Sequence, residues 1–362
     1  MRRRAIAVLV ALWPVAAMGG PEAFCTAFDE MSGRAPAPGF AAGFVRGDAP
    51  GVELAAGVTR RGGAQPVGSP GPWHIGSIAK SFTATLIVQL AAAGQLDLDA
   101  PLPELLPGEA AGMHPDWSAV TLRGLLSHTA GMPANLPWRR LARSGGPGLR
   151  AARLAAMRQL WAQPVAGRPG RFVYSNTGYV LAGTVAEQVT GRSWEALIRT
   201  QIAAPLGLDS LGFGPPDGAA VPWGHRRVLG LTWAVSPDAT WADNPAIIGP
   251  AGTLHLSLAD LLAWGRAHLA ACRGGRPDLI PAADCRAMQD PVAGPYALGW
   301  VVTDQPDGTR VVWHNGSNSL WFAMLAMVPA RDLVFAYVQN AGGAAGDRTA
   351  DRLLAALLAP DG

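Results

Sequence analysis

Lys80 is the only lysine among 29 basic side chains in this chain, and Ser77 precedes it by three residues. Arginine is effectively never deprotonated, whereas a lysine in a desolvated or positive environment can lose its proton and act as a base. Side chains three apart face the same side of a helix, and the first helical turn favours a neutral lysine beside a developing negative charge. We therefore predict that Ser77 and Lys80 form a nucleophile and base pair. The alternative is a surface lysine without a role.

A second candidate cluster is Tyr174-Ser175-Asn176, which follows a Pro169-Gly170 turn and precedes a helical segment. A tyrosine hydroxyl presented there can relay a proton between a nucleophile and a leaving group. The asparagine amide can hold a lysine amine or a substrate amide. The alternative is a buried tyrosine beside a local asparagine cap.

A third cluster, His314-Asn315-Gly316-Ser317, closes a predicted strand. Gly316 would let a ligand backbone approach closely. An edge strand there could offer an N–H to a substrate oxygen and complete an oxyanion hole with the N–H of Ser77. The alternative is a hairpin turn with a solvated histidine.

Together the three clusters resemble the motifs of the penicillin-recognising serine hydrolases, the S-x-x-K group. The chain is similar to the branch that holds class C β-lactamases, D-aminopeptidases and esterases, from about Pro38 to the C-terminus. Further matching stretches lie at 74–84, 94–101, 125–133, 249–252 and 296–300.

The resemblance implies one role for each matched residue. Ser77 would be the acylated nucleophile, Lys80 its base and Tyr174 the proton relay. Asn176 would contact the substrate and the lysine, and Ser317 would supply the second oxyanion N–H. Ser127 and His128, within a matching stretch, are expected to be turn and packing residues.

One departure concerns specificity, because this chain has His314-Asn-Gly316 where the lactamases have Lys-Thr-Gly. That lysine helps to bind the substrate carboxylate in lactamases, so its absence argues against efficient β-lactam hydrolysis. A His-x-Gly variant is similar to the aminopeptidase and esterase members. His314 could bind a carboxylate when protonated or orient Tyr174 when neutral.

Other chemistries have little support in the sequence. There is no G-x-S-x-G elbow, no H-E-x-x-H, no clustered His/Cys set and no phosphate-binding glycine motif, so we expect neither a metal nor another cofactor. His225, His255 and His268 are isolated and are expected to be structural. Three tryptophans are candidates for an apolar acyl pocket: Trp138, Trp241 and Trp321.

The elements that must position these groups follow from the periodicity. Strands are expected at 40–45 and 52–58, a buried helix at 77–93 ending at Gly94, and helices at 148–163 and 178–190. Ser257 and Asp260 resemble a capping box that opens a further helix. Strands are expected at 296–303, 309–314, 319–328 and 332–339, followed by a helix at 347–359.

Strands at both ends around a helical middle predict an α+β fold of β-lactamase-like type. An antiparallel sheet built from both termini would be flanked by helices and carry an inserted all-α subdomain. We expect a single catalytic domain over 18–362, with its α/β part at about 38–94 and 246–362 and its all-α part at about 95–245.

The N-terminus has the layout of a secretory signal peptide over residues 1–17, with Arg2 to Arg4 before an apolar run and a cleavage site after Ala17. The run is shorter than the roughly 20 residues of a membrane-spanning helix. Its removal would leave 26 basic and 26 acidic side chains, which gives no reason to expect nucleic acid or an anionic membrane as a partner. We expect an exported, periplasmic or secreted protein without a stable membrane anchor.

Export favours disulfide formation, and Cys272 and Cys285, 13 residues apart, are the first candidates, although spacing alone does not settle connectivity. Cys25 would be a spare or late-pairing thiol.

The predicted function is a cofactor-free serine hydrolase that acts through an acyl-enzyme on a small-molecule or peptide substrate. The bond could be an ester, an amide, a D-amino-acid peptide or a β-lactam. The alternative is a catalytically weak penicillin-binding or cell-wall peptide sensor protein that keeps the motifs as a binding cleft.

Overall fold

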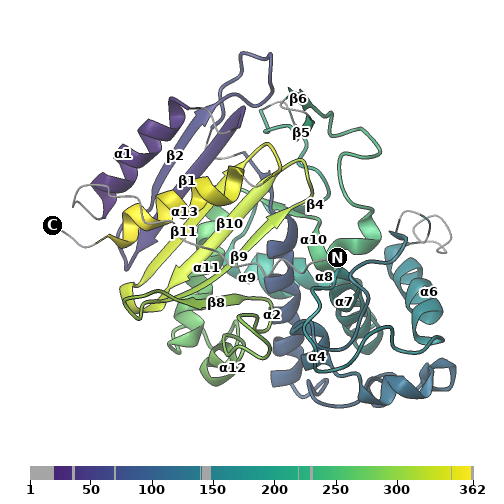
Figure 1. Ribbon diagram of the computed structural model, residues 1–362. Coiled ribbons are helices and arrows are strands. Elements are labelled where there is room, and N and C mark those ends of the chain that lie inside the picture. The colour runs from purple at the N-terminus through teal and green to yellow at the C-terminus, as the bar shows by residue number, and fades with distance from the viewer. Residues whose placement is uncertain are drawn as a thin grey trace.

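The computed structural model describes residues 20–34, 37–68, 71–138, 140, 148–218, 220–228, 231–343 and 345–359. The expected signal peptide at 1–17 lies outside these residues. Figure 1 shows a strand layer at one side of the molecule and a mainly helical part at the other. Among the described residues, no helix has the length and apolar character needed to cross a membrane.

The main sheet is antiparallel, with the strand order β2-β1-β11-β10-β9-β8. Its strands are β1 (Gly39–Arg46), β2 (Val52–Gly57), β8 (Val301–Asp304), β9 (Arg310–Ser317), β10 (Phe322–Val328) and β11 (Leu333–Gln339). Strand β1 pairs directly with β11, so that Phe40 lies opposite Gln339. The prediction of a sheet built from both termini is therefore confirmed.

Helices cover both faces of this sheet. Helices α1 (Pro21–Ser32) and α13 (Ala345–Leu358) lie side by side across one face (Figure 1) and enclose an apolar cluster that includes Phe24 and Leu353. Helix α11 (Leu258–Cys272) packs on the opposite face against β1, β10 and β11. Ser257 caps α11 as predicted, because its Oγ accepts a hydrogen bond of 3.1 Å from the Asp260 N–H.

The helical part consists of short helices around the buried helix α2 (Ala79–Ala92). The others are α3 (Leu102–Leu105), α4 (Leu122–Leu126), α6 (Leu149–Trp161), α7 (Asn176–Thr190), α8 (Trp194–Leu197), α9 (Ala204–Leu206) and α10 (Gly249–Gly252). Helix α12 (Ala282–Ala287) instead packs against α11. Short 3₁₀ segments are η1 (Gly76–Ile78), η2 (Ala110–Gly112), η3 (Pro115–Ala119), η5 (Ala246–Ile248) and η6 (Pro329–Arg331), and η4 (Ile198–Ala203) is a π-helical segment between α8 and α9. One apolar core runs from α2 into both the helices and the sheet.

The expectation of an all-α middle segment is wrong in detail. Strand β4 (Gly212–Phe213) joins β3 (Trp73–His74) and β7 (Leu254–Leu256) in a second sheet. Strands β5 (His225–Val228) and β6 (Leu231–Ala234) form a separate hairpin. All of these strands are short, so local periodicity gave no indication of them. Two of the three strands in the second sheet also come from outside the middle segment.

Two strand boundaries also differ from those expected. Residues 296–300 form a loop, with Gly299 at a φ of +79°, and β8 begins only at Val301. Strand β10 begins at Phe322 rather than at 319, because the Asn318 side chain accepts the N–H groups of Leu320 and Trp321. The sequence pattern suggested that a neighbouring strand would accept these N–H groups. The Asn318 side chain accepts them instead.

The disulfide between Cys272 and Cys285 is present and links the end of α11 to α12, with the Cα atoms 4.9 Å apart. This confirms the first candidate pair. Cys25 is a free, half-buried thiol in α1.

Candidate active site

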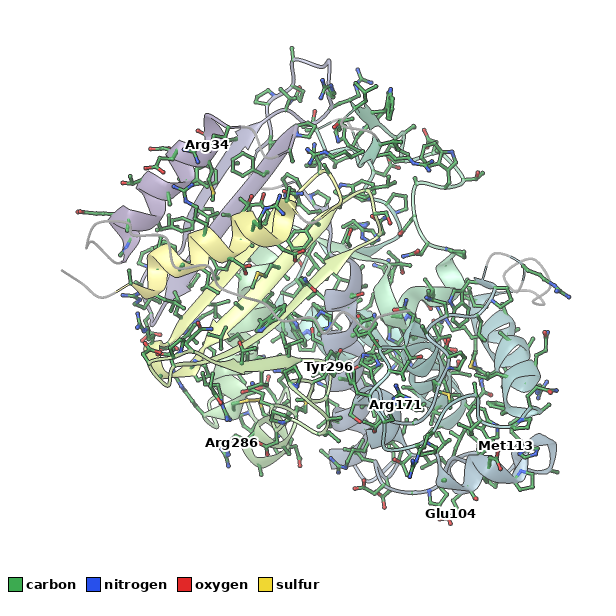
Figure 2. The ribbon with its side chains drawn as sticks, viewed as in Figure 1. Arg34, Glu104, Met113, Arg171, Arg286 and Tyr296 are labelled. Carbon is green, nitrogen blue, oxygen red and sulfur yellow. A yellow bond between two sulfur atoms is a disulfide. The ribbon has the colours of Figure 1, made fainter. Side chains whose placement is uncertain are left out.

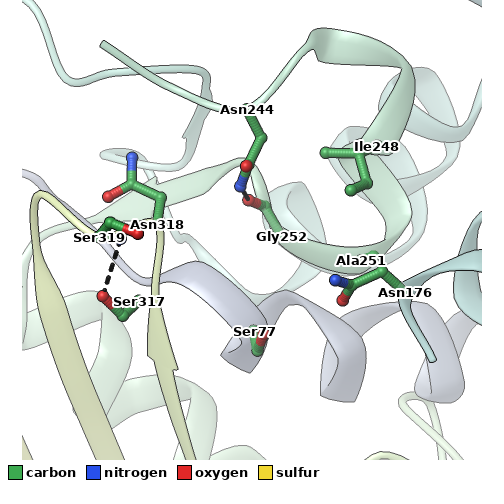
Figure 3. A pocket seen from close by; sticks show the side chains of 9 residues that line it. All are labelled: Ser77, Asn176, Asn244, Ile248, Ala251, Gly252, Ser317, Asn318 and Ser319. Atoms are coloured by element: carbon green, nitrogen blue, oxygen red, sulfur yellow. Dashed lines mark hydrogen bonds between the residues drawn. The ribbon is translucent and has the colours of Figure 1, made fainter. Parts of the chain in front are cut away.

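A polar pocket opens where the two parts of the molecule meet (Figure 3). It is lined by Ser77, Asn176, Asn244, Ile248, Ala251, Gly252, Ser317, Asn318 and Ser319. These residues come from η1, the start of α7, the 244–252 segment and the end of β9 with the loop that follows it. None of the side chains in this lining carries a charge.

Ser77 lies at the base of the pocket, in the tight turn η1 between β3 and α2. The turn depends on Gly76, whose φ is +52°, a left-handed conformation that glycine adopts without steric cost. The nucleophile candidate is thus in a 3₁₀ turn that leads into α2, rather than in the α-helix itself.

Lys80 is fully buried, and its amine lies within hydrogen-bond distance of three oxygens. Nζ is 3.0 Å from Ser77 Oγ, 2.8 Å from Asn176 Oδ1 and 2.7 Å from the Ala251 carbonyl oxygen. Burial holds the pKa of the Lys80 amine well below its usual range, because a desolvated ammonium loses its hydration.

The partners of Lys80 determine where a neutral amine directs its lone pair. Asn176 Oδ1 and the Ala251 carbonyl can only accept, so they take the two N–H bonds of the neutral amine. The lone pair then faces the Ser77 hydroxyl, which can both donate and accept. This arrangement suits removal of the Ser77 proton.

Asn176 is itself held in one orientation. Its Nδ2 donates to Asn135 Oδ1 at 2.9 Å, and the Trp138 indole N–H also donates to that oxygen at 3.4 Å. These donors leave Asn176 Oδ1 as the oxygen that meets Lys80. Ser175, the cap of α7, fixes the start of the helix by accepting the Gly178 N–H.

Tyr174 lies immediately before α7, with its ring centre 4.9 Å from Lys80 Nζ. The side chain exposes 36% of its surface, but its hydroxyl lies in a desolvated environment. That burial raises the pKa of the Tyr174 hydroxyl, and a hydrogen bond with Ser77 opposes the rise only in part. Tyr174 therefore stays protonated at neutral pH and is suited to donate a proton rather than to accept one.

Ser77 and Ser317, the residues expected to offer oxyanion N–H groups, both line the pocket. The last residues of β9 extend beyond β8, because the β8 pairing ends at Trp313 opposite Val301. This leaves the strand edge at 314–317 free to face η1. Gly316 packs so closely there that a Cβ atom would lie 2.5 Å from the Ser77 nitrogen.

His314 differs from the expectation that it could bind a substrate carboxylate. Its side chain is 2% exposed and lies outside the pocket lining. Nδ1 donates to the Asn315 carbonyl at 2.5 Å, so Nε2 accepts the Tyr296 hydroxyl at 3.0 Å. Burial, assisted by Lys80, lowers the pKa of His314 to about 3, which keeps the ring neutral.

A neutral His314 acts on Tyr174 only indirectly. It holds Tyr296, which lies between the sheet and the helical part (Figure 2). The Tyr296 ring meets the Tyr174 ring edge-on at 6.1 Å. The orienting role considered for His314 would therefore operate through Tyr296.

Ser127 and His128 have packing and turn contacts, as expected. The Ser127 hydroxyl donates to the Arg123 carbonyl, and His128 Nδ1 accepts the Ser175 N–H. The His128 ring packs 4.4 Å from the Tyr174 ring, so it supports the loop that carries Tyr174.

The isolated histidines also have structural partners. His225 and His255 each bond a backbone carbonyl through Nδ1, and His268 pairs with the Thr85 hydroxyl through Nε2.

None of the three candidate tryptophans lines the pocket. Trp138 supports Asn135, Trp321 is the buried last residue of the loop after β9, and Trp241 is 47% exposed on the surface.

Sequence reasoning missed several groups that complete the site. Ala251 supplies a carbonyl to Lys80, and Asn135 orients Asn176. Asn244 and Asn318 line the pocket. The stretch at 249–252 had matched the family, but nothing in an alanine indicates that its carbonyl oxygen is the functional atom.

The fold and these contacts define a serine hydrolase of the S-x-x-K type. The family model described as Beta-lactamase matches residues 25–359. The chain is 32% identical over 332 residues to penicillin-binding protein 4 of Amycolatopsis lactamdurans, covering 87% of this chain and 84% of that protein. It is 32% identical over 182 residues to esterase EstB of Burkholderia gladioli, covering 47% of this chain and 46% of the esterase.

A solved structure of SurE with D-Leu is 30% identical, covers 93% of this chain and 74% of that chain, and superposes with a TM-score of 0.73. This chain belongs to the beta-lactamase family. It is a serine hydrolase with the α+β fold of that family.

Proposed function

We propose that this protein is an exported hydrolase that cleaves esters and amides, including D-amino-acid derivatives, through an acyl-enzyme on Ser77. One observation carries the proposal. The only lysine in the chain is fully buried, and its amine reaches Ser77 Oγ while two acceptor-only oxygens hold its N–H bonds.

Acylation begins when Ser77 Oγ bonds to the substrate carbonyl carbon and its proton moves to Lys80 Nζ. The carbonyl oxygen becomes an oxyanion, and the N–H groups of Ser77 and Ser317 stabilise it. When the intermediate collapses, the bond to the leaving group breaks and Tyr174 donates its hydroxyl proton to that group. The Lys80 ammonium then returns a proton to the Tyr174 oxygen, so that both groups are neutral again.

Deacylation repeats the sequence with water as the nucleophile. Lys80 takes a proton from the water as the oxygen adds to the acyl carbon. The Ser77 ester bond breaks, Ser77 Oγ recovers a proton from Lys80, and the acid product leaves. The raised pKa of Tyr174 supports Lys80 rather than Tyr174 as the base in this step.

The pocket lining supports substrates whose reacting region is uncharged. Its side chains are hydroxyls, amides and small apolar groups, and His314 is neutral and directed elsewhere. A substrate carboxylate would therefore lack the cationic partner that lactamases provide. The relative solved with D-Leu supports D-amino-acid groups, and the esterase relative supports esters.

Export is supported by two features. Arg2 to Arg4 before an apolar run are typical of a signal peptide, and the Cys272–Cys285 disulfide suits an oxidising compartment. We propose a periplasmic or secreted location on this basis.

The second candidate function is a slow penicillin-binding or cell-wall peptide sensor protein. The similarity to a penicillin-binding protein of Amycolatopsis lactamdurans favours it. The two functions differ in turnover, because an enzyme releases product repeatedly whereas a sensor is acylated at most once.

Intact mass measured after incubation with a fluorophosphonate, and separately with a penicillin, tests the proposal. We expect a single fluorophosphonate adduct on the wild type and none on Ser77→Ala. A stable penicillin adduct together with no ester or amide turnover would favour the sensor. A folded wild type that neither reagent labels would contradict the nucleophile assignment.

A further inference from the structure

The two N–H donors of the proposed oxyanion hole belong to separate elements, the turn η1 and the end of strand β9. An oxyanion hole stabilises charge only when both donors point at the same oxygen. Close backbone packing between Gly76 and Gly316 brings the two elements together. That packing sets the distance between the two elements. It does not explain what fixes the direction of the two N–H donors.

His74 is the last residue of β3, two positions before η1, and is fully buried. Its Nδ1 accepts the Gly76 N–H at 3.1 Å, so the ring proton is on Nε2. Nε2 then donates to Asp243, and both carboxylate oxygens lie 2.9 Å away. The histidine thereby ties the Gly76 peptide of the nucleophile turn to a carboxylate on a different segment.

Asp243 connects that turn to the loop after β9. Its Oδ1 accepts Asn318 Nδ2 at 2.9 Å and the Asn244 N–H at 2.6 Å. Asn318 and Asn244 both line the pocket. The Asp243 side chain itself is only 5% exposed, so its bonds are shielded from competing water.

Asn318, which its bond to Asp243 holds in place, in turn fixes the position of Ser317. Its Oδ1 accepts the N–H groups of Leu320 at 3.0 Å and Trp321 at 3.2 Å. The Ser317 hydroxyl donates to the Trp321 carbonyl at 2.5 Å and accepts the Ser319 N–H at 3.0 Å. The Trp321 ring also stacks on His74, with the centroids 5.7 Å apart.

We propose that His74 and Asp243 are positioning residues that, through Asn318, align the N–H groups of Ser77 and Ser317 on one substrate oxygen. This inference rests on the proposed function. Neither side chain touches the reacting atoms, so loss of the bridge acts on the direction of the donors and not on Ser77 or Lys80.

The test compares an ester with its thionoester, in which sulfur replaces the carbonyl oxygen. Sulfur accepts hydrogen bonds poorly, so thionoester turnover depends much less on the oxyanion hole. For Asp243→Asn we expect kcat on the oxygen ester to fall roughly 10- to 100-fold, the scale of a misplaced reacting group, with KM little changed. Thionoester kcat should change far less. The rate ratio, defined as kcat on the oxygen ester divided by kcat on the thionoester, should therefore fall.

Two variants of His74 each remove one of its two hydrogen bonds, the one from Gly76 or the one to Asp243. His74→Gln can still donate to Asp243 but loses the acceptor for Gly76, whereas His74→Asn keeps that acceptor and loses the donor. We expect both to lower the rate ratio, since either break interrupts the bridge. They also keep the test open if Asp243→Asn fails to fold.

Asp260→Asn is the control, because the Asp260 carboxylate also accepts hydrogen bonds, two of them from Ser210, but lies outside the pocket lining. It should lower the thermal midpoint without changing the rate ratio. A folded Asp243→Asn whose ratio equals that of the wild type would overturn the inference. A wild type that turns over neither ester would instead refute the proposed function, and the inference with it.

Discussion

The amine of Lys80 and the amide oxygen of Asn176 are 2.8 Å apart inside a desolvated site. The two residues come from α2 and α7, which pack against each other. Because the amide is a neutral acceptor, it orients the amine without stabilising the ammonium as a carboxylate would. The contact therefore controls both the direction and the protonation state of Lys80.

Asn176→Asp should raise the pKa of Lys80. An opposite charge within about 4 to 6 Å shifts a pKa by roughly 1 to 3 units. Activity needs the neutral amine, so it is lost as the pH falls through the Lys80 pKa, and the variant should lose it at a higher pH. The profile of kcat/KM against pH measures the shift. Asn135→Asp adds the same charge without touching Lys80 and should move the profile less.

Lys80→Arg should remove most of the turnover although it conserves the formal charge. Arginine cannot be deprotonated at working pH, so no base would face Ser77. We expect kcat/KM to fall about 10²- to 10⁴-fold, the typical contribution of general base catalysis. Circular dichroism should show an intact fold, and near-normal kinetics would refute Lys80 as the base.

Tyr174→Phe should harm amide substrates more than activated esters. An amide leaving group needs a proton as its bond breaks, whereas a nitrophenolate leaves without one. We expect a loss of about 10²-fold or more on amides and a much smaller loss on nitrophenyl esters. Equal losses on both substrates would argue against the proton donor role.

Gly316→Ala should lower kcat, because the added methyl group would lie 2.5 Å from the Ser77 nitrogen and push β9 away. Weakening one oxyanion donor costs about 10²- to 10³-fold in kcat. Gly112→Ala places its methyl group in open space and serves as the control. Unchanged kinetics in Gly316→Ala would refute the proposed hole.

Removing the Cys272–Cys285 bridge by a double serine substitution should reduce the free energy of unfolding by about 3 kcal/mol, the value for a loop of this length. Denaturant unfolding measures the change. Cys25→Ser, which removes the free thiol, should have a much smaller effect. Because the bridge lies away from the pocket lining, kcat should be nearly unchanged in the folded double variant.

The sequence was most informative where an element's own residues decide its structure. Strands at 40–45 and 332–339 and the cap at Ser257 were predicted because alternation and capping are local patterns. Helix α1 was overlooked although Pro21 begins it and Phe24, Phe28 and Met31 follow with helical spacing. The 296–300 loop was read as a strand because its aromatic and aliphatic residues are buried, although only isolated bridges at Tyr296 pair them and no continuous strand forms.

The residues of the candidate site also differ in how far the sequence predicts them. Ser77, Lys80 and Asn176 were singled out because their side chain types are suited to the predicted chemistry, and the structure brings them together. The Ala251 carbonyl was not found, since any residue could provide it. The sequence left two roles open for His314, and only its environment in the folded chain, which keeps the ring neutral and buried, favours the orienting role over carboxylate binding.

The pairing of β1 with β11 also has a consequence for folding. The Gly39 N–H donates to Asn340 Oδ1 across 301 positions of sequence, and Ser77 meets the Ser317 strand end through the same long-range closure. Contacts of such high sequence separation form late, because the entropy of closing the chain must be overcome first. A nascent chain therefore contains Ser77 long before the strand end that carries Ser317 can reach it, so we expect the proposed acylating activity only after the last strands have joined the sheet.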